Sequence, residues 1–136
     1  MKHIILSFAI ATLVFTACKK PDTTAEPTTT TPTPVVLKGA KGGNYAIVAF
    51  TKQSSSDVNA RVFIKYAANT APSDTNGYDE KYTAVAEPGF GTHAHFNKLT
   101  TGTYFIRAMY NTIKADTVME IKDSTAIETD ITLQLK

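Results

Sequence analysis

Two histidines, His93 and His95, are the side chains in this sequence best suited to bind a metal ion. Side chains two positions apart on a β-strand project from the same face, and imidazole nitrogen binds zinc and copper. Since Phe96 is expected to point inward, both histidines are expected to point to solvent. The sequence places no cysteine, further histidine or clustered carboxylate beside them. It leaves two interpretations, a weak Cu or Zn site and two solvated histidines.

A second set of candidate ligands lies in residues 74–80, which read DTNGYDE. Oxygen-bearing side chains alternate there and a glycine allows a sharp turn. The segment lacks the ligand spacing of the EF-hand loop and its terminal glutamate. It is either a calcium loop or a polar turn.

The remaining side chains are not arranged in a pattern typical of catalysis. There is no Gly-rich phosphate loop and no Ser or Cys nucleophile with a plausible histidine and acid, and the carboxylates are spread singly over turns and outer strand faces. The net charge is +2, and loss of a leader containing Lys2 lowers it by one, which leaves no electrostatic footprint for nucleic acid. We therefore expect a protein that is not an enzyme and binds no nucleic acid.

The single cysteine, Cys18, follows a segment typical of export signals. A short basic start precedes the 12-residue apolar run Ile4–Phe15, which is shorter than the roughly 20 residues that span a bilayer. With Thr16 and Ala17 before the cysteine, this segment resembles a bacterial lipoprotein signal, although Phe15 replaces the usual Leu. The resemblance implies a signal peptide at 1–17, lipidation of Cys18, and anchoring to the bacterial outer membrane or cell envelope. The alternative is a secretory leader followed by a free thiol.

Residues 19–34 contain four prolines, seven threonines and no large apolar side chain. Such a segment cannot bury a core, and in a polyproline-II conformation it would reach roughly 50 Å at about 3.1 Å per residue. We assign 18–42 to the lipid-bearing cysteine and this tether. Its start resembles lipoproteins of the Bacteroidetes type, in which Asp, then Ser or Thr, then a small residue accepts an O-glycan. The resemblance implies Thr23 as an acceptor, with weaker matches at 116–118 and 123–125.

Residues 43–136 alternate apolar and polar side chains with the period of β-strands. A turn at Gly102 precedes the strand 104–110, in which Tyr104, Ile106 and Ala108 are expected to face inward. Seven short strands separated by turns predict an all-β fold, a seven-stranded antiparallel β-sandwich. The expected core is Ile47, Val62, Ile64, Tyr66, Phe96, Leu99, Tyr104, Ile106, Ile131 and Leu133.

The segment 96–108, with Phe96, Leu99, Gly102 and Tyr104, resembles the carboxypeptidase-regulatory-like, or transthyretin-like, β-sandwich domains, whose fold is immunoglobulin-like. Residues 58–64 match the second strand of that family. The resemblance implies an accessory module of the kind found beside enzymes and transporters.

The outward positions of two long strands suggest a surface for a partner. Phe63, Phe105 and Met109 alternate with basic residues, including Arg107, so neighbouring strands would form an apolar patch with a basic rim. Scattered apolar residues on a surface are also ordinary. Three loop aromatics offer sugar-stacking rings: Tyr78, Tyr82 and Phe90.

Together these features predict a membrane-anchored envelope lipoprotein whose sandwich is a non-catalytic accessory, binding or structural module. Its partners would be the membrane, through the lipid, and an envelope protein or glycan. The alternatives are a glycan-binding surface lipoprotein and a periplasmic metal-handling protein that uses His93 and His95.

Overall fold

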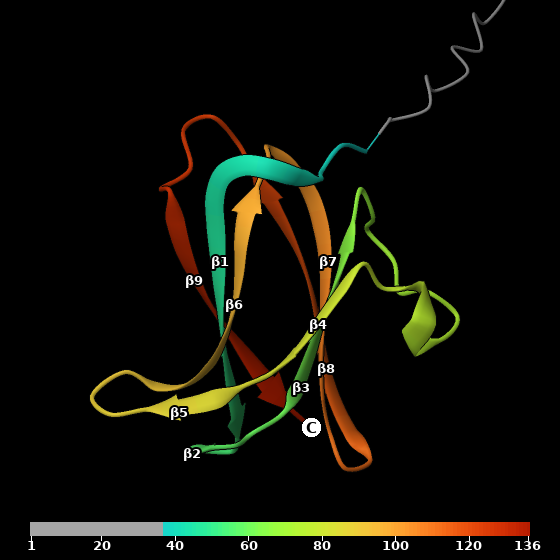
Figure 1. Cartoon of the computed structure of the whole chain (residues 1–136). Coiled ribbons are helices and arrows are strands. Elements are labelled where there is room, and N and C mark those ends of the chain that lie inside the picture. Colours follow the sequence, from blue (N-terminus) through green and yellow to red (C-terminus); the bar gives the residue numbers. More distant parts are fainter. Residues whose placement is uncertain (1–36) are drawn as a thin grey trace, which may run out of the picture. The chain divides into compact units, whose positions relative to one another are not determined.

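The computed structural model describes residues 37–136, so the signal peptide 1–17, Cys18, Thr23 and the tether up to residue 36 lie outside the described residues. The described part is a β-sandwich, which confirms the predicted all-β class (Figure 1). It contains nine strands and one 3-10 turn, η1 (Thr75–Gly77). The strands are β1 (Lys41–Gln53), β2 (Ser56–Asp57), β3 (Arg61–Tyr66), β4 (Glu80–Thr83), β5 (Val85–Glu87), β6 (Gly91–Leu99), β7 (Gly102–Tyr110), β8 (Ile113–Ile121) and β9 (Glu128–Leu135).

The strands form two sheets. Sheet A joins β5 to β6, β6 to β1, and β1 to both β2 and β9, whereas sheet B has the order β4-β3-β7-β8. Every pairing is antiparallel except that of β1 with β9, which is parallel and runs from Ala46 opposite Glu128 to Gln53 opposite Leu135. An antiparallel arrangement was predicted throughout, so the parallel last strand is a departure from the expectation.

Two strands more than expected are present, for two local reasons. The two-residue strand β2 pairs back onto the end of β1. The single strand expected at 81–86 is divided at Ala84, because the chain leaves sheet B there and enters sheet A. Ala84 is fully buried and its N–H donates to the carbonyl of Ala60 at 2.8 Å. The β4–β5 crossing closes this side of the sandwich, whereas β8 and β9 are the edge strands on the other side (Figure 1).

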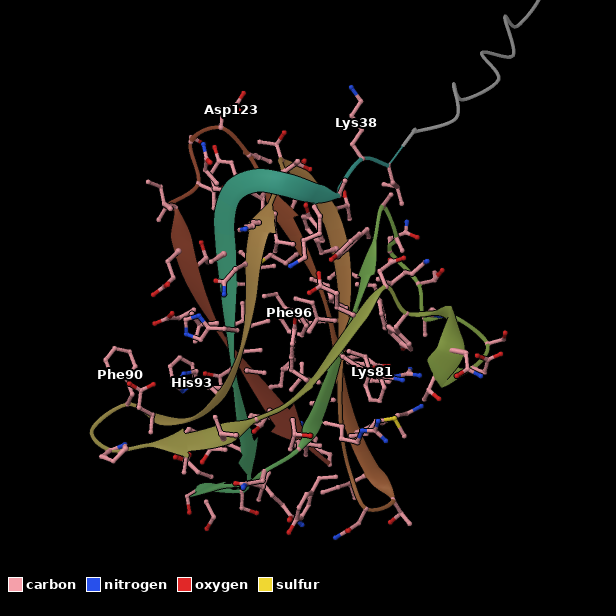
Figure 2. The ribbon with its side chains drawn as sticks, viewed as in Figure 1. Lys38, Lys81, Phe90, His93, Phe96 and Asp123 are labelled. Atoms are coloured by element: carbon pink, nitrogen blue, oxygen red, sulfur yellow. The ribbon has the colours of Figure 1, made fainter. Side chains whose placement is uncertain are left out.

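The predicted core is confirmed. Eight of its ten residues are at most 2% exposed, and the other two, Tyr66 and Ile131, are half-buried and pack against the rest. Phe96 lies near the centre of the sandwich in Figure 2. Ala108 is also buried, so the inward face of β7 is the one expected from its alternation.

The domain begins earlier than residue 43, because the chain before β1 is fixed to the turn between β6 and β7. The hydroxyl of Tyr104 donates to the carbonyl of Thr100 at 2.8 Å and accepts from the N–H of Ala40 at 3.2 Å. Gly102 has φ +146°, and a Cβ there would overlap the carbonyl of Lys38. The ordered strand β1 therefore starts at Lys41, inside the segment assigned to the tether.

Replacing Tyr104 with Phe tests this junction. The substitution leaves the carbonyl of Thr100 without its hydroxyl donor, whereas the N–H of Ala40 keeps the hydroxyl of Thr100 as a partner at 3.0 Å. We therefore expect the free energy of unfolding to fall by about 1–2 kcal/mol. Tyr66→Phe is the matched control, since the Tyr66 hydroxyl is buried with no hydrogen-bond partner among residues 37–136. That substitution should leave stability unchanged or slightly higher. Equal losses for the two variants in urea unfolding would contradict the role assigned to Tyr104.

Candidate functional site

The patch predicted on sheet B is not exposed, so this prediction is wrong. β3 and β7 are neighbours as expected, but Phe63 and Phe105 are only 2% and 6% exposed. The ring of Tyr78, from the segment between β3 and β4, lies over them with ring centroids 5.2 and 6.3 Å away. Phe63 and Phe105 therefore belong to a covered layer rather than an exposed partner surface, and Arg107 and Met109 on β7 are half-buried.

Asp79 and Asp74 hold the covering segment in place. The Asp79 carboxylate accepts the N–H of Tyr66 at 2.6 Å and the ammonium of Lys65 at 3.0 Å. Asp74 Oδ1 accepts the N–H groups of Asn76 and Gly77, which caps η1. Both carboxylates thus stabilise the turn itself, which favours the polar-turn interpretation over a calcium loop.

Arg107 is held in an ion pair on this covered layer. It donates two parallel hydrogen bonds, each 2.6 Å, to the carboxylate of Asp116 on the adjacent strand β8. Its guanidinium also lies 5.7 Å from the ring centroid of Phe105. The hydrogen bonds from Arg107 lower the pKa of Asp116 below its ordinary value.

The two histidines share the outer face of sheet A, but only His95 is exposed. His93 is 4% exposed because its ring is enclosed by Phe50 and Phe90, with centroids 5.4 and 6.1 Å away. The expectation that both would point to solvent is therefore wrong for His93. The two imidazole rings lie 5.0 Å apart.

The polar contacts of His93 are local. Its Nδ1 lies 3.3 Å from the carbonyl oxygen of Gly91, and its Nε2 lies 3.4 Å from a carboxylate oxygen of Glu87. Within residues 37–136, no group of three or more His, Cys, Asp or Glu side chains is arranged to hold a metal ion. The proposed Cu or Zn site stays a prediction that rests on the histidine pair.

An exposed apolar cluster surrounds His93. Val85 is opposite His93 on β5, and Phe50 is opposite it on β1, so the three side chains form one row across sheet A. Phe90, at the turn between β5 and β6, lies beside His93 (Figure 2). Phe90 is 62% exposed and Val85 is 59% exposed. We call Phe50, Val85, Phe90, His93 and His95 the hairpin face.

Of the three loop aromatics, Phe90 alone is part of this face. Tyr78 covers Phe63, and Tyr82 packs on Phe96 at a centroid distance of 5.3 Å while remaining 46% exposed. The hairpin face was not predicted as a unit, because Phe50 and Val85 lie on different strands. Only the pairing register reveals that they share a row with His93.

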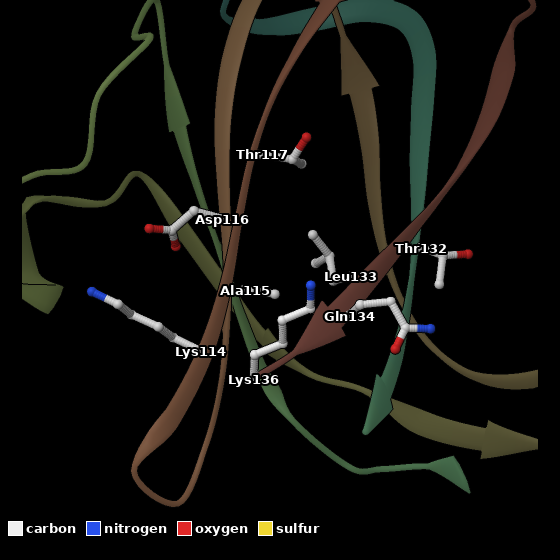
Figure 3. Close-up of a pocket in the computed structure, with 8 residues that line it drawn as sticks. All are labelled: Lys114, Ala115, Asp116, Thr117, Thr132, Leu133, Gln134 and Lys136. Atoms are coloured by element: carbon white, nitrogen blue, oxygen red, sulfur yellow. The ribbon is translucent and has the colours of Figure 1, made fainter. Parts of the chain in front are cut away.

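A groove of about 400 Å³ lies at the other side of the sandwich, between β8 and β9 (Figure 3). Its lining is largely polar and includes Lys114, Asp116, Gln134 and Lys136. The N–H of Lys136 donates to the carbonyl of Lys114 at 3.4 Å across one end of it.

Comparison with protein-family models and with curated proteins finds no match to this chain. Within the described residues, no helix has the length and apolar character needed to cross a membrane.

The Arg107–Asp116 pair predicts a pH-dependent stability difference. Because the folded state holds the pKa of Asp116 low, the pair stabilises the fold above the unfolded value of about 3.9, and this contribution disappears as the pH falls through the folded pKa. Asp116→Asn should therefore lower the free energy of unfolding by about 0.5–1 kcal/mol near pH 6, and by much less below pH ~3. Urea unfolding of the wild-type and Asp116→Asn proteins at the two pH values measures this difference.

Asp123→Asn is the control, because Asp123 forms no ion pair within residues 37–136. The same loss for Asp116→Asn at both pH values would contradict the contribution of the ion pair.

Proposed function

We propose that this protein is an envelope lipoprotein, anchored through Cys18, whose sandwich is a non-catalytic binding module that engages its partner through the hairpin face. The observation that carries the proposal is the exposure of Phe90 and Val85 around the buried His93 on the outer face of sheet A. An exposed apolar cluster of this kind is typical of a protein-binding surface.

The anchoring half of the proposal is supported by the order of segments along the chain. An apolar run, small residues and a lone cysteine precede a Thr- and Pro-rich segment, and the first strand begins only at Lys41. Residues 19–37 therefore separate the lipid attachment site from the first residue bonded to the fold, Lys38. Two or three acyl chains anchor such a domain stably, since each buried methylene contributes about 0.8 kcal/mol.

The proposal that the sandwich is non-catalytic is supported by the contacts of the acidic side chains in the described part. Asp57, Asp79 and Asp116 each form an ion pair with Lys52, Lys65 or Arg107. The hydrogen bond from Lys52 lowers the pKa of Asp57, as Arg107 does for Asp116. The lowered pKa values keep the carboxylates of Asp57 and Asp116 ionised and paired at neutral pH, which suits a structural role better than proton transfer.

The hairpin face fits a partner with an apolar contact point better than a charged one. Phe90 and Val85 present exposed apolar surface, whereas two carboxylates nearby are engaged within the domain, that of Glu87 with His93 and that of Asp57 with Lys52. An aromatic ring exposed at the tip of a hairpin also suits stacking on a sugar ring, so a glycan is the second candidate ligand. The accessory role expected from the transthyretin-like resemblance is compatible with either.

Substitution of Cys18 tests the anchor. Cys18→Ala should move the protein from the membrane pellet to the soluble envelope fraction and abolish incorporation of labelled fatty acid. Lys19→Ala is the matched control and should remain in the pellet. A Cys18→Ala protein that still sediments with membranes would contradict anchoring through this residue.

The hairpin face is tested by truncating its most exposed ring. With a photo-crosslinking residue at position 85 of the membrane-anchored chain, a discrete adduct with one envelope protein is expected. Phe90→Ala should lower affinity on the order of thirtyfold, because loss of a central aromatic contact costs roughly 2 kcal/mol.

The control for this experiment is Ile127→Ala, a residue that is 70% exposed and lies outside the hairpin face. It should leave the adduct unchanged. A different outcome would identify a glycan as the ligand: no adduct forms, the protein is retained on envelope polysaccharide, and Phe90→Ala abolishes that retention. If neither binding depends on Phe90, the hairpin face is not the binding surface.

A further inference from the structure

The strand β8 has a hydrogen-bonding edge that is free beyond Lys114. The carbonyl of Lys114 accepts from the N–H of Lys136, the residue after β9, so the backbone of Lys114 points away from β7. The N–H and C=O groups of alternate residues along a strand point to the same side. The backbone groups of Asp116, Val118 and Glu120 therefore also point to the open edge, and within residues 37–136 they have no hydrogen-bond partner.

The side chains of these edge residues are exposed as well. Lys114, Asp116, Val118 and Glu120 all lie on the outer face of sheet B, and Val118 is 47% exposed. An edge of this kind, nine residues long with an apolar side chain on it, is a template for pairing with another strand. β9 also has an open edge, but its exposed side chains at 128, 130, 132 and 134 are all polar.

We propose that β8 pairs with β8 of a second copy of this chain, antiparallel, about a two-fold axis that passes through Thr117. In this register Lys114 is opposite the partner's Glu120, and Asp116 is opposite the partner's Val118. The two-fold axis repeats each pair, so the contact contains two ion pairs between Lys114 and Glu120. Asp116 and the partner's Val118 point their free backbone groups across the interface, as hydrogen-bonded pairs require, whereas the carbonyl of Lys114 already accepts from Lys136.

The charges on β8 disfavour the neighbouring registers. An axis through Asp116 places two Asp116 carboxylates opposite each other. An axis through Val118 places Asp116 opposite the partner's Glu120, and Lys114 opposite the partner's Lys122. Like charges directly opposite each other destabilise a strand pair, whereas opposite charges stabilise it. Of these three axes, the one at Thr117 alone places opposite charges opposite each other.

Lys114 and Lys136 both line the groove beside β8, but their side chains diverge, so Lys114 is the cation that lies opposite the partner's Glu120 (Figure 3). In the monomer Glu120 has only an exposed contact, 3.2 Å from Lys122. Pairing therefore brings this carboxylate into a more positive environment than it has alone.

The contact is small, and its strength depends on concentration. A single strand pair buries less surface than the roughly 1,600 Å² of a standard stable interface, so the dimer dissociates readily in dilute solution. The contact itself does not require lipidation. If the protein is anchored through Cys18, confinement to a membrane raises the effective concentration and favours the dimer.

Disulfide formation at position 117 tests the register. In this arrangement Thr117 faces Thr117 of the partner subunit in a non-hydrogen-bonded pair, for which the Cα atoms lie about 4.5 Å apart, within the range that a disulfide spans. In the chain carrying Cys18→Ser, Thr117→Cys supplies the single thiol. At high protein concentration under mild oxidation it should form covalent dimers at least tenfold faster than Thr83→Cys. Thr83 lies on β4, the opposite edge of sheet B. Equal rates would overturn the proposal.

Charge reversal provides an independent test on the Thr117→Cys background. Lys114→Glu and Glu120→Lys should each slow cross-linking, by about three- to tenfold, since each places like charges opposite one another twice. The double variant restores opposite charges and should restore the rate. Thermal unfolding of each variant verifies that the fold is intact. Failure of the double variant to recover, with all variants folded, would overturn the proposed register.

Discussion

The need to satisfy one buried hydroxyl organises this domain. Tyr104 is fully buried in the core, where an unpaired hydroxyl would be costly, and its partners are the backbone groups of Ala40 and Thr100. These groups come from the segment before β1 and from the turn after β6. The hydroxyl therefore ties the start of the domain to the centre of both sheets. The close approach of Lys38 to Gly102 follows from it, because only a residue without Cβ fits there.

The position of the two candidate interaction surfaces follows from how the sandwich is closed. At Ala84 the chain passes from sheet B to sheet A, so β4 and β5 cover one side of the core. The hairpin from β5 to β6 then places Phe90 beside His93 on the outer face of sheet A. The opposite side has no such crossing, and β8 remains an edge beside the groove. The hairpin face and the β8 edge are therefore separate surfaces, which allows a second copy and another ligand to bind together.

The alternation of side chains predicted the all-β class and the core, because burial on one face of a strand imposes a period of two whatever the partner strand is. It could not predict what covers the other face. Phe63 and Phe105 alternate as outward residues should, yet Tyr78 from a distant loop buries them. His93 is covered in the same way by Phe90. The direction of β9 could not be predicted either, because a strand shows the same alternation of side chains in a parallel pair, as β9 has with β1, as in an antiparallel one.

The four sheet edges differ in how they are protected from other strands. β4 and β5 have four and three residues and join at the crossing, so neither offers a long template. β8 has nine residues, with no proline in the strand, and the exposed Val118 at its edge. Proteins commonly protect such an edge with lysines or prolines, whereas β8 carries Lys114, Asp116 and Glu120 in an order complementary to itself. Pairing two β8 strands around a two-fold axis uses both β8 edges and leaves the short β4 edges at the ends of the joined sheet B, while the open β9 edge of each sheet A carries only polar exposed side chains. The assembly therefore closes at two copies, which is why this pattern favours a dimer over open-ended association.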